Sequence, residues 1–212
     1  RSMKEFFMTQ WHGAETYFEK NLKPTFYFCL AFFGIMIVLN SLLFLSDPGL
    51  SQSYFSELQA LFSQKDFLDG TGINLWLGIF VNNVIASGIS SLLGAIPFLF
   101  LPMFSLASNA IIIGLIGAVY QTNGIGWFAF LVGVLPHGLI EIPALVLGVS
   151  LGVHLCYKLS KTILRRSSKG ELKQAAIGCL RIYLLWLIPL FFIAAFIETF
   201  MTPILFNAVV SA

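Results

Sequence analysis

Residues 25–46 read TFYFCLAFFGIMIVLNSLLFLS, and this stretch contains no charged side chain. A helix that crosses the hydrocarbon core of a bilayer needs about 20 consecutive apolar residues, and this run is long enough. Comparable apolar runs occupy residues 73–95, 98–120, 127–157 and 182–206. The pattern predicts an all-α, polytopic integral membrane protein with five transmembrane helices.

The composition of the whole chain agrees with this class of protein. Of its 212 residues, 58% are hydrophobic and only 10% are charged, whereas a soluble domain averages about 25% charged residues. A soluble core of this size cannot hide so much apolar surface. The three cysteines show no paired spacing, which argues against a disulfide framework or a cysteine-based zinc site.

The segments between the spans differ in character. Residues 1–24 form an amphipathic segment, which we expect to lie in the membrane interface as a helix; contact with a partner protein is the alternative. Arg1 and Ser2 precede Met3, and we interpret them as a cloning remnant. Residues 25–206 form a single predicted transmembrane domain, which includes an amphipathic outer segment at 47–72 and a basic segment at 158–181.

The basic residues predict the orientation of the chain. With five crossings and a cytoplasmic amino terminus, all of the 12 lysines and arginines except Lys65 fall on the cytoplasmic side, as the positive-inside rule requires. We therefore expect a bacterial cell membrane protein whose amino terminus faces the cytoplasm. The basic segment is expected to contact anionic membrane lipids. It lacks the interleaved aromatic residues of a nucleic-acid-binding surface.

Two prolines interrupt the apolar pattern of the fourth segment. Pro136 and Pro143 each lack a backbone N–H, and each disfavours the helical state in the residue before it. The sequence predicts that the fourth transmembrane helix is broken at these positions. Kinks are expected in the fifth span near Pro189 and Pro203 for the same reason.

Small residues recur at helical spacing in two spans. Ser87, Ser91 and Ala95 repeat every four positions, and so do Gly148 and Gly152. Such faces are typical of helices that pack closely within a membrane.

Polar side chains gather at similar depth in four of the predicted spans. Ionisable groups inside a membrane are costly and usually functional. At a rise of about 1.5 Å per residue, these side chains lie about 12–21 Å from the outer end of their spans. We predict a shared buried polar site, made from His137, Glu141, Asn82, Asn83, Asn109 and Glu198.

His137 and Glu141 are the candidate metal ligands, because they are four residues apart and share one helical face. Histidine and carboxylate groups can bind a divalent metal such as zinc, but a catalytic zinc usually has three protein ligands. A third group, such as Glu198 or Asn82, would have to come from another helix. In the competing interpretation the pair is structural, and the two side chains bond each other or neighbouring amides.

The prolines of the fourth segment belong to the stretch Pro136-His137-Gly138-Leu139-Ile140-Glu141-Ile142-Pro143-Ala144, which is preceded by Asn82-Asn83 and by Asn109 in earlier spans. This combination of motifs resembles the stage II sporulation protein M family. The likeness covers roughly residues 70–206, and Ala110 departs from the glycine that is typical of the family after the asparagine. The resemblance implies a multi-pass membrane protein of a spore-forming bacterium or a relative. It further implies a scaffold in engulfment that assembles cell-wall hydrolases for peptidoglycan remodelling, without established catalysis of its own.

Three functions therefore stay open from the sequence. The first is a membrane scaffold that holds envelope proteins and can also form homo-oligomers. The second is a metal-dependent intramembrane enzyme, or a metal-binding membrane protein, centred on His137 and Glu141. The third is a transporter or channel component that uses Glu141 and Glu198 to carry protons or ions.

Overall fold

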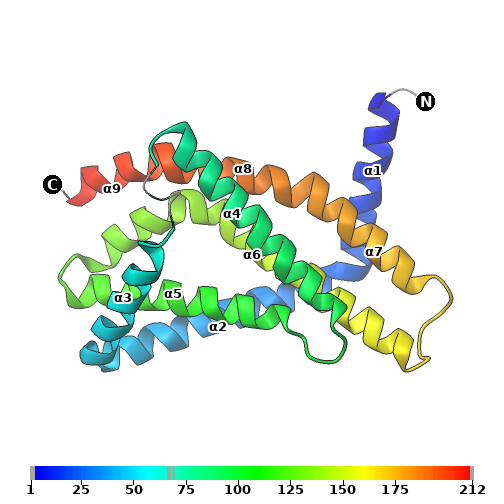
Figure 1. The fold of residues 1–212 in the computed structure, drawn as a ribbon, viewed down its shortest axis with the longest axis horizontal. Helices are drawn as coiled ribbons and strands as arrows, with labels where there is room; N and C mark the ends of the chain where they lie inside the picture. Colours follow the sequence, from blue (N-terminus) through cyan, green and yellow to red (C-terminus); the bar gives the residue numbers. More distant parts are fainter. Residues whose placement is uncertain (1–2, 66–67, 69, 211–212) are drawn as a thin grey trace. The chain divides into compact units, whose positions relative to one another are not determined.

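The computed structural model describes residues 3–65, 68 and 70–210, and every regular element in these residues is helical (Figure 1). Residues 1, 2, 66, 67, 69, 211 and 212 lie outside the described part, and with them the interpretation of Arg1 and Ser2. The prediction of an all-α protein is confirmed. The elements are α1 Met3–Tyr17, η1 Phe18–Leu22, α2 Lys23–Ser46, α3 Pro48–Phe62, α4 Ile73–Leu92, η3 Leu93–Ala95, α5 Pro102–Thr122, α6 Gly126–Ile163, α7 Glu171–Ile182, η4 Tyr183–Leu187, α8 Ile188–Phe196, η5 Ile197–Met201 and α9 Thr202–Val210.

Within the described residues, five helical runs are long and apolar enough to cross a membrane. Large apolar side chains on these runs face outward, as at Leu42, Phe128 and Ile204. Hydrocarbon can solvate such surfaces, and helices satisfy their own backbone hydrogen bonds there. The chain is therefore a multi-pass membrane protein, as predicted. The runs are Met3–Ser46, Ile73–Ala95, Pro102–Thr122, Gly126–Ile163 and Glu171–Val210.

The third span begins later than the apolar pattern predicted. Its helix, α5, starts at Pro102 rather than at Phe98. Phe98 and Phe100 have positive φ values of 68° and 47°, a conformation that a helix cannot contain. Proline is well suited to the first turn of a helix, because the N–H that it lacks would have no partner there.

The predicted break in the fourth helix is wrong. α6 runs without interruption from Gly126 to Ile163 and contains both Pro136 and Pro143. Each proline costs the helix only one hydrogen bond, and neighbouring helices in a bundle can compensate such a loss. The turn between the two prolines has such neighbours, because its side chains hydrogen-bond to α4 and to α9. The helix therefore continues through both positions.

The fifth span contains a π-helical turn before each of its two prolines, whereas the predicted kinks stay a prediction. η4 ends two residues before Pro189, and η5 ends two residues before Pro203. In these turns a carbonyl bonds the N–H five residues later, as Ile197 does with Thr202. A wider turn lets the helix bypass the donor that proline lacks and relieves the clash of its ring with the preceding turn.

The chain divides into two compact units, each of which has its own packing. The prediction of a single transmembrane domain from 25 to 206 stays a prediction. The first unit comprises the chain up to Ala31, Val84–Leu106 and Pro143–Leu190, and the second comprises Phe32–Asn83, Ala107–Ile142 and the chain from Phe191 onward.

Small residues bring α4 and α6 together in the first unit. The Ser91 hydroxyl donates to the carbonyl oxygen of Gly148 at 2.8 Å. A Cβ atom placed on Gly94 would lie 2.7 Å from the Cα of Gly152. The prediction of close packing is confirmed for Ser91, Gly148 and Gly152, whereas Ala95 is exposed and Gly94 makes the contact in its place.

α1 packs against α7 in the same unit. Arg181 on α7 donates to the side-chain oxygen of Gln10 at 2.7 Å. Tyr17 lies against Gly178 of α7, where a Cβ atom would collide with its ring. The position of residues 1–24 at the membrane interface stays a prediction.

The second unit contains an apolar cluster between α2, α3 and α5. Phe44 of α2 and Leu115 and Val119 of α5 are buried, and Leu50 and Leu58 of α3 pack against them. The opposite side of α3, which carries Gln52, Ser56 and Gln59, is exposed. The cluster holds α3 against the spans.

Candidate functional site

Three of the predicted polar residues come together within the second unit. His137 and Glu141 lie one turn apart on α6, and Glu198 lies in η5. Each offers one nitrogen or oxygen ligand atom, and these atoms all lie within 4.8 Å of one another. All three residues are half-buried. This cluster is the candidate functional site.

The π-helical turn η5 places the third member. π-turns are rare, and they occur often at functional sites because they shift the side chains that follow. Here the turn presents both Glu198 and Thr202 toward α6: the Thr202 hydroxyl lies 3.2 Å from Nδ1 of His137. Glu198 belongs to the cluster with the same histidine.

The hydrogen bonds of Thr202 indicate the tautomer of His137. The single O–H of Thr202 donates to the carbonyl oxygen of Ile197 at 3.3 Å. Its oxygen is then free to accept from Nδ1–H of His137. A neutral imidazole protonated at Nδ1 keeps its lone pair on Nε2. Metal-binding histidines are typically oriented by such a second hydrogen bond.

A chain of polar side chains leads to the carboxylate of Glu141. Asn83 on α4 donates to Oε1 of Glu141 at 3.1 Å, and Asn82 donates to Oδ1 of Asn83 at 3.4 Å. Lys65, which lies between α3 and α4, donates to Oδ1 of Asn82 at 3.3 Å. Glu141 is thereby oriented by an amide, and the chain extends to a cation outside the spans.

The two carboxylates of the cluster repel each other when both are ionised. In a low-dielectric environment such a pair either shares a proton or holds a cation. A divalent cation would neutralise both charges and would keep His137 unprotonated. The arrangement is therefore suited to metal binding or to proton storage.

The set of donor groups fits zinc. Zinc binds histidine nitrogen and carboxylate oxygen at about 2.0–2.2 Å, and tetrahedral ligands are then about 3.4 Å apart. The ligand atoms here lie within 4.8 Å of one another, so small side-chain movements would bring them to that spacing. Three protein ligands would leave one position of a tetrahedral site for water.

The remaining predicted residues lie around this cluster or away from it. Asn83 contacts Glu141 directly, whereas Asn82 is one hydrogen bond further away. Asn109 lies half-buried on α5 in the same unit. His154 is not among the predicted residues; it belongs to the first unit, where its Nε2 lies 2.8 Å from the hydroxyl of Tyr17.

Sequence reasoning missed Thr202. A threonine is an ordinary residue in a membrane helix, and nothing in its own pattern marks it. Its position four residues after Glu198 and directly before Pro203 was the available signal.

The sequence model of the family described as Stage II sporulation protein M matches residues 26–203. The chain belongs to the stage II sporulation protein M family. The match contains the whole candidate site and extends the expected likeness, which began near residue 70, through the first span. No curated protein and no solved structure matches the chain. The family membership and the apolar helices together identify a multi-pass membrane protein of a sporulation family.

Proposed function

We propose that this member of the stage II sporulation protein M family binds a divalent metal ion, with zinc as the best candidate, inside its membrane-spanning helices. The ligands are His137, Glu141 and Glu198. The observation that carries the proposal is the convergence of one imidazole and two carboxylates from α6 and η5 within 4.8 Å.

The hydrogen bonds around the ligands support the same proposal. Thr202 orients His137, and Asn83 orients Glu141. Carboxylates and imidazoles that bind metals are usually held in this way by outer groups. A purely structural pair would need no second carboxylate nearby, since adding Glu198 increases the charge to be neutralised.

The experiment measures metal in the purified full-length chain by elemental analysis. We expect about one zinc ion per chain, as in a mononuclear site, and a loss of zinc in His137→Ala, Glu141→Gln and Glu198→Gln. His12→Ala and Glu57→Gln are matched controls, because these residues lie outside the cluster. A parent protein that holds no stoichiometric metal, even after incubation with zinc, would show that the proposal is wrong.

A second proposal, a scaffold role, is supported by the family membership and by α3. α3 packs through Leu50 and Leu58 on the apolar cluster of its own unit, and Leu61 and Phe62 at the end of the helix stay 61% and 38% exposed. Apolar groups on a segment outside the spans are typical of a docking surface. We propose that α3 binds an envelope protein, such as a cell-wall hydrolase engaged in peptidoglycan remodelling during engulfment.

Affinity capture from bacterial membranes tests this role. We expect cell-wall hydrolases in the captured material from the parent, and their loss in the double variant Leu61→Ser, Phe62→Ser. The metal content of that variant should be unchanged, because α3 contributes no ligand. Equal capture by parent and variant would refute docking on α3.

A further inference from the structure

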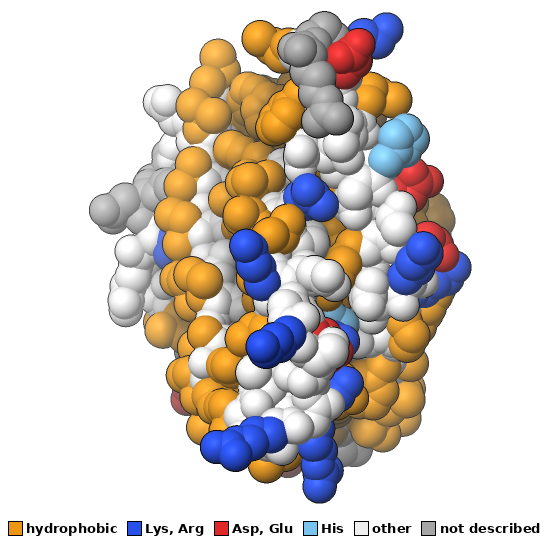
Figure 2. Space-filling model, turned by 90° about the vertical axis from the view of Figure 1, so that its right-hand side faces the viewer, with side chains coloured by type: hydrophobic (Ala, Val, Ile, Leu, Met, Phe, Trp, Pro, Cys, Tyr) orange, Lys and Arg blue, Asp and Glu red, His pale blue; other side chains and the backbone are white. Residues whose placement is uncertain are grey.

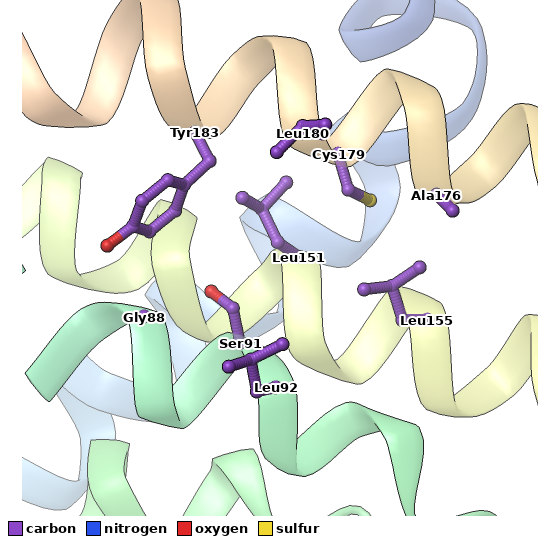
Figure 3. Close-up of a pocket in the computed structure, with 9 residues that line it drawn as sticks. All are labelled: Gly88, Ser91, Leu92, Leu151, Leu155, Ala176, Cys179, Leu180 and Tyr183. Atoms are coloured by element: carbon purple, nitrogen blue, oxygen red, sulfur yellow. The ribbon is translucent and has the colours of Figure 1, made fainter. Parts of the chain in front are cut away.

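The first unit, which contains none of the proposed metal ligands, has a cavity of its own. A cavity of about 400 Å³ lies between α4, α6 and α7, and it continues along η4 (Figure 3). Leu151 and Leu155 of α6 line it, with Leu92 of α4 and Ala176 and Leu180 of α7 around them. Its volume is within the range of about 300–1,000 Å³ that is usual for ligand pockets.

The polar groups at this cavity already have partners. The Ser91 hydroxyl donates to the carbonyl oxygen of Gly148 at 2.8 Å, and the Tyr183 hydroxyl donates to that of Val84 at 2.6 Å. The cavity therefore presents carbon to its occupant. A hydrocarbon chain can fill it without leaving a buried polar group unpaired.

A polar, basic cavity of about 310 Å³ lies at the connection between α6 and α7. Arg165 and Lys169 line it, together with Thr162, Ser167 and Ser168. The Thr162 and Ser167 hydroxyls already donate within the chain, so the two cations are the main groups that could bind an anion. Lysine and arginine side chains are gathered on this face of the molecule (Figure 2). These groups are suited to an anion such as a phosphate.

Glu171, which accepts from the backbone N–H of Ser168 at this cavity, does not neutralise these two cations. Glu171 is held by Lys158 at 2.5 Å and by Lys161 at 3.4 Å. In the described part of the chain, Arg165 and Lys169 have no ion pair with a carboxylate. Their charge remains available to a ligand.

The two cavities follow each other along the same helices. On α7, Leu172 at the basic cavity precedes Ala176 at the apolar one by four residues, or about 6 Å. On α6, Thr162 follows Leu155 by seven residues, or about 10 Å. A phosphate at one end and a hydrocarbon chain at the other is the chemistry of a phospholipid. Basic pockets between transmembrane helices commonly bind anionic lipid headgroups.

We propose that the groove formed by α4, α6 and α7 binds one anionic phospholipid of the surrounding membrane. Its phosphate lies at Arg165 and Lys169, and one acyl chain lies along Leu155 and Leu151 toward Tyr183. The site is independent of the metal ligands, which belong to the second unit.

Native mass spectrometry of the full-length chain tests the proposal. The protein is released from detergent in the presence of equal amounts of dioleoyl-phosphatidylglycerol and dioleoyl-phosphatidylcholine. We expect one tightly retained phosphatidylglycerol per chain. Arg165→Gln with Lys169→Gln should lower the preference for the anionic lipid by about fivefold per charge removed. Lys4→Gln with Lys20→Gln, which removes two exposed charges of the amino-terminal segment, should leave the preference unchanged.

Two further variants test the acyl-chain part of the site. Ala176→Trp and Leu180→Trp should each fill the groove and lower the retention of both lipids. Ile177→Trp is the matched control, because this exposed residue of α7 does not line the cavity. Leu180 is itself 57% exposed, so its replacement should not disturb folding, which thermal gel filtration checks.

Three outcomes would overturn the proposal. The first is equal retention of the two lipids by the parent. The second is equal retention by the groove variants and by Ile177→Trp. The third is a change in the dimer fraction of Ala176→Trp with unchanged lipid retention, which would assign the groove to a second copy of the chain.

Discussion

Replacing Asn83 by alanine isolates one hydrogen bond of the proposed metal site. The amide of Asn83 donates to Oε1 of Glu141 at 3.1 Å. A hydrogen bond to an ionised group contributes about 1.5–3 kcal/mol. That free energy corresponds to a factor of about 10–150 in an equilibrium constant. Loss of an outer-shell partner of a metal ligand independently predicts a fall in metal affinity of about 10–100-fold. We therefore expect Asn83→Ala to lower the zinc affinity by about 10–100-fold.

The assay is a competition titration of the purified chain with a chromophoric zinc chelator. Asn82→Ala is the matched control, since it removes the same amide from the neighbouring position on the same helix. Asn82 bonds Asn83 at 3.4 Å and is one hydrogen bond removed from the carboxylate. Its replacement should lower zinc affinity by less than about threefold, because the effect on Glu141 is only indirect.

Zinc binding by Asn83→Ala that is as tight as in the parent would refute the role of Asn83 in orienting Glu141. An equal loss of zinc affinity in the Asn82 and Asn83 variants would refute it as well. Equal losses would mean that the amides maintain the fold of α4 rather than the orientation of Glu141. Thermal stability, measured on the same preparations, separates these two effects.

Two further predictions concern packing and topology. Gly94→Ala should lower the free energy of unfolding by about 1–3 kcal/mol, because its Cβ atom would collide with the backbone of Gly152. Gly34→Ala is the control and should not destabilise the protein, since nothing lies within 4 Å of that position. Unfolding in denaturing detergent measures both variants, and equal stability of the two would contradict the close packing. Leu61→Cys should react with an impermeant thiol reagent from outside the cell, and Lys169→Cys should not, because the positive-inside rule assigns Lys169 to the cytoplasm. The native cysteines are buried and should give little background labelling. The reverse labelling pattern would overturn the predicted orientation.

The sequence by itself determined the number of spans and both bounds of the second span. The thickness of the bilayer sets the length of an apolar run, and this relation does not depend on which helices are neighbours. For that reason the predicted second span, 73–95, coincides with α4 and η3. The pairing of His137 and Glu141 on one face also followed from the sequence, because the helical repeat of 3.6 residues fixes it locally.

Only the tertiary structure decided how each proline is accommodated. Pro143 lies within a continuous α-helix, whereas Pro203 follows a π-helical turn. The sequence predicts a lost hydrogen bond at both prolines equally. Whether the helix continues, widens or ends depends on which neighbouring side chains hold the affected turn.

The membership of the site was likewise decided by the tertiary structure. Depth along a span is readable from the sequence, and it nominated Glu198 together with three asparagines, Asn82, Asn83 and Asn109. The rotation of each helix about its axis is set by packing against its neighbours, and it decides which side chains meet. Packing placed Asn83 rather than Asn82 on Glu141. It also brought Glu198 and Thr202 to His137, because a π-turn in the last span changes the direction in which its side chains point.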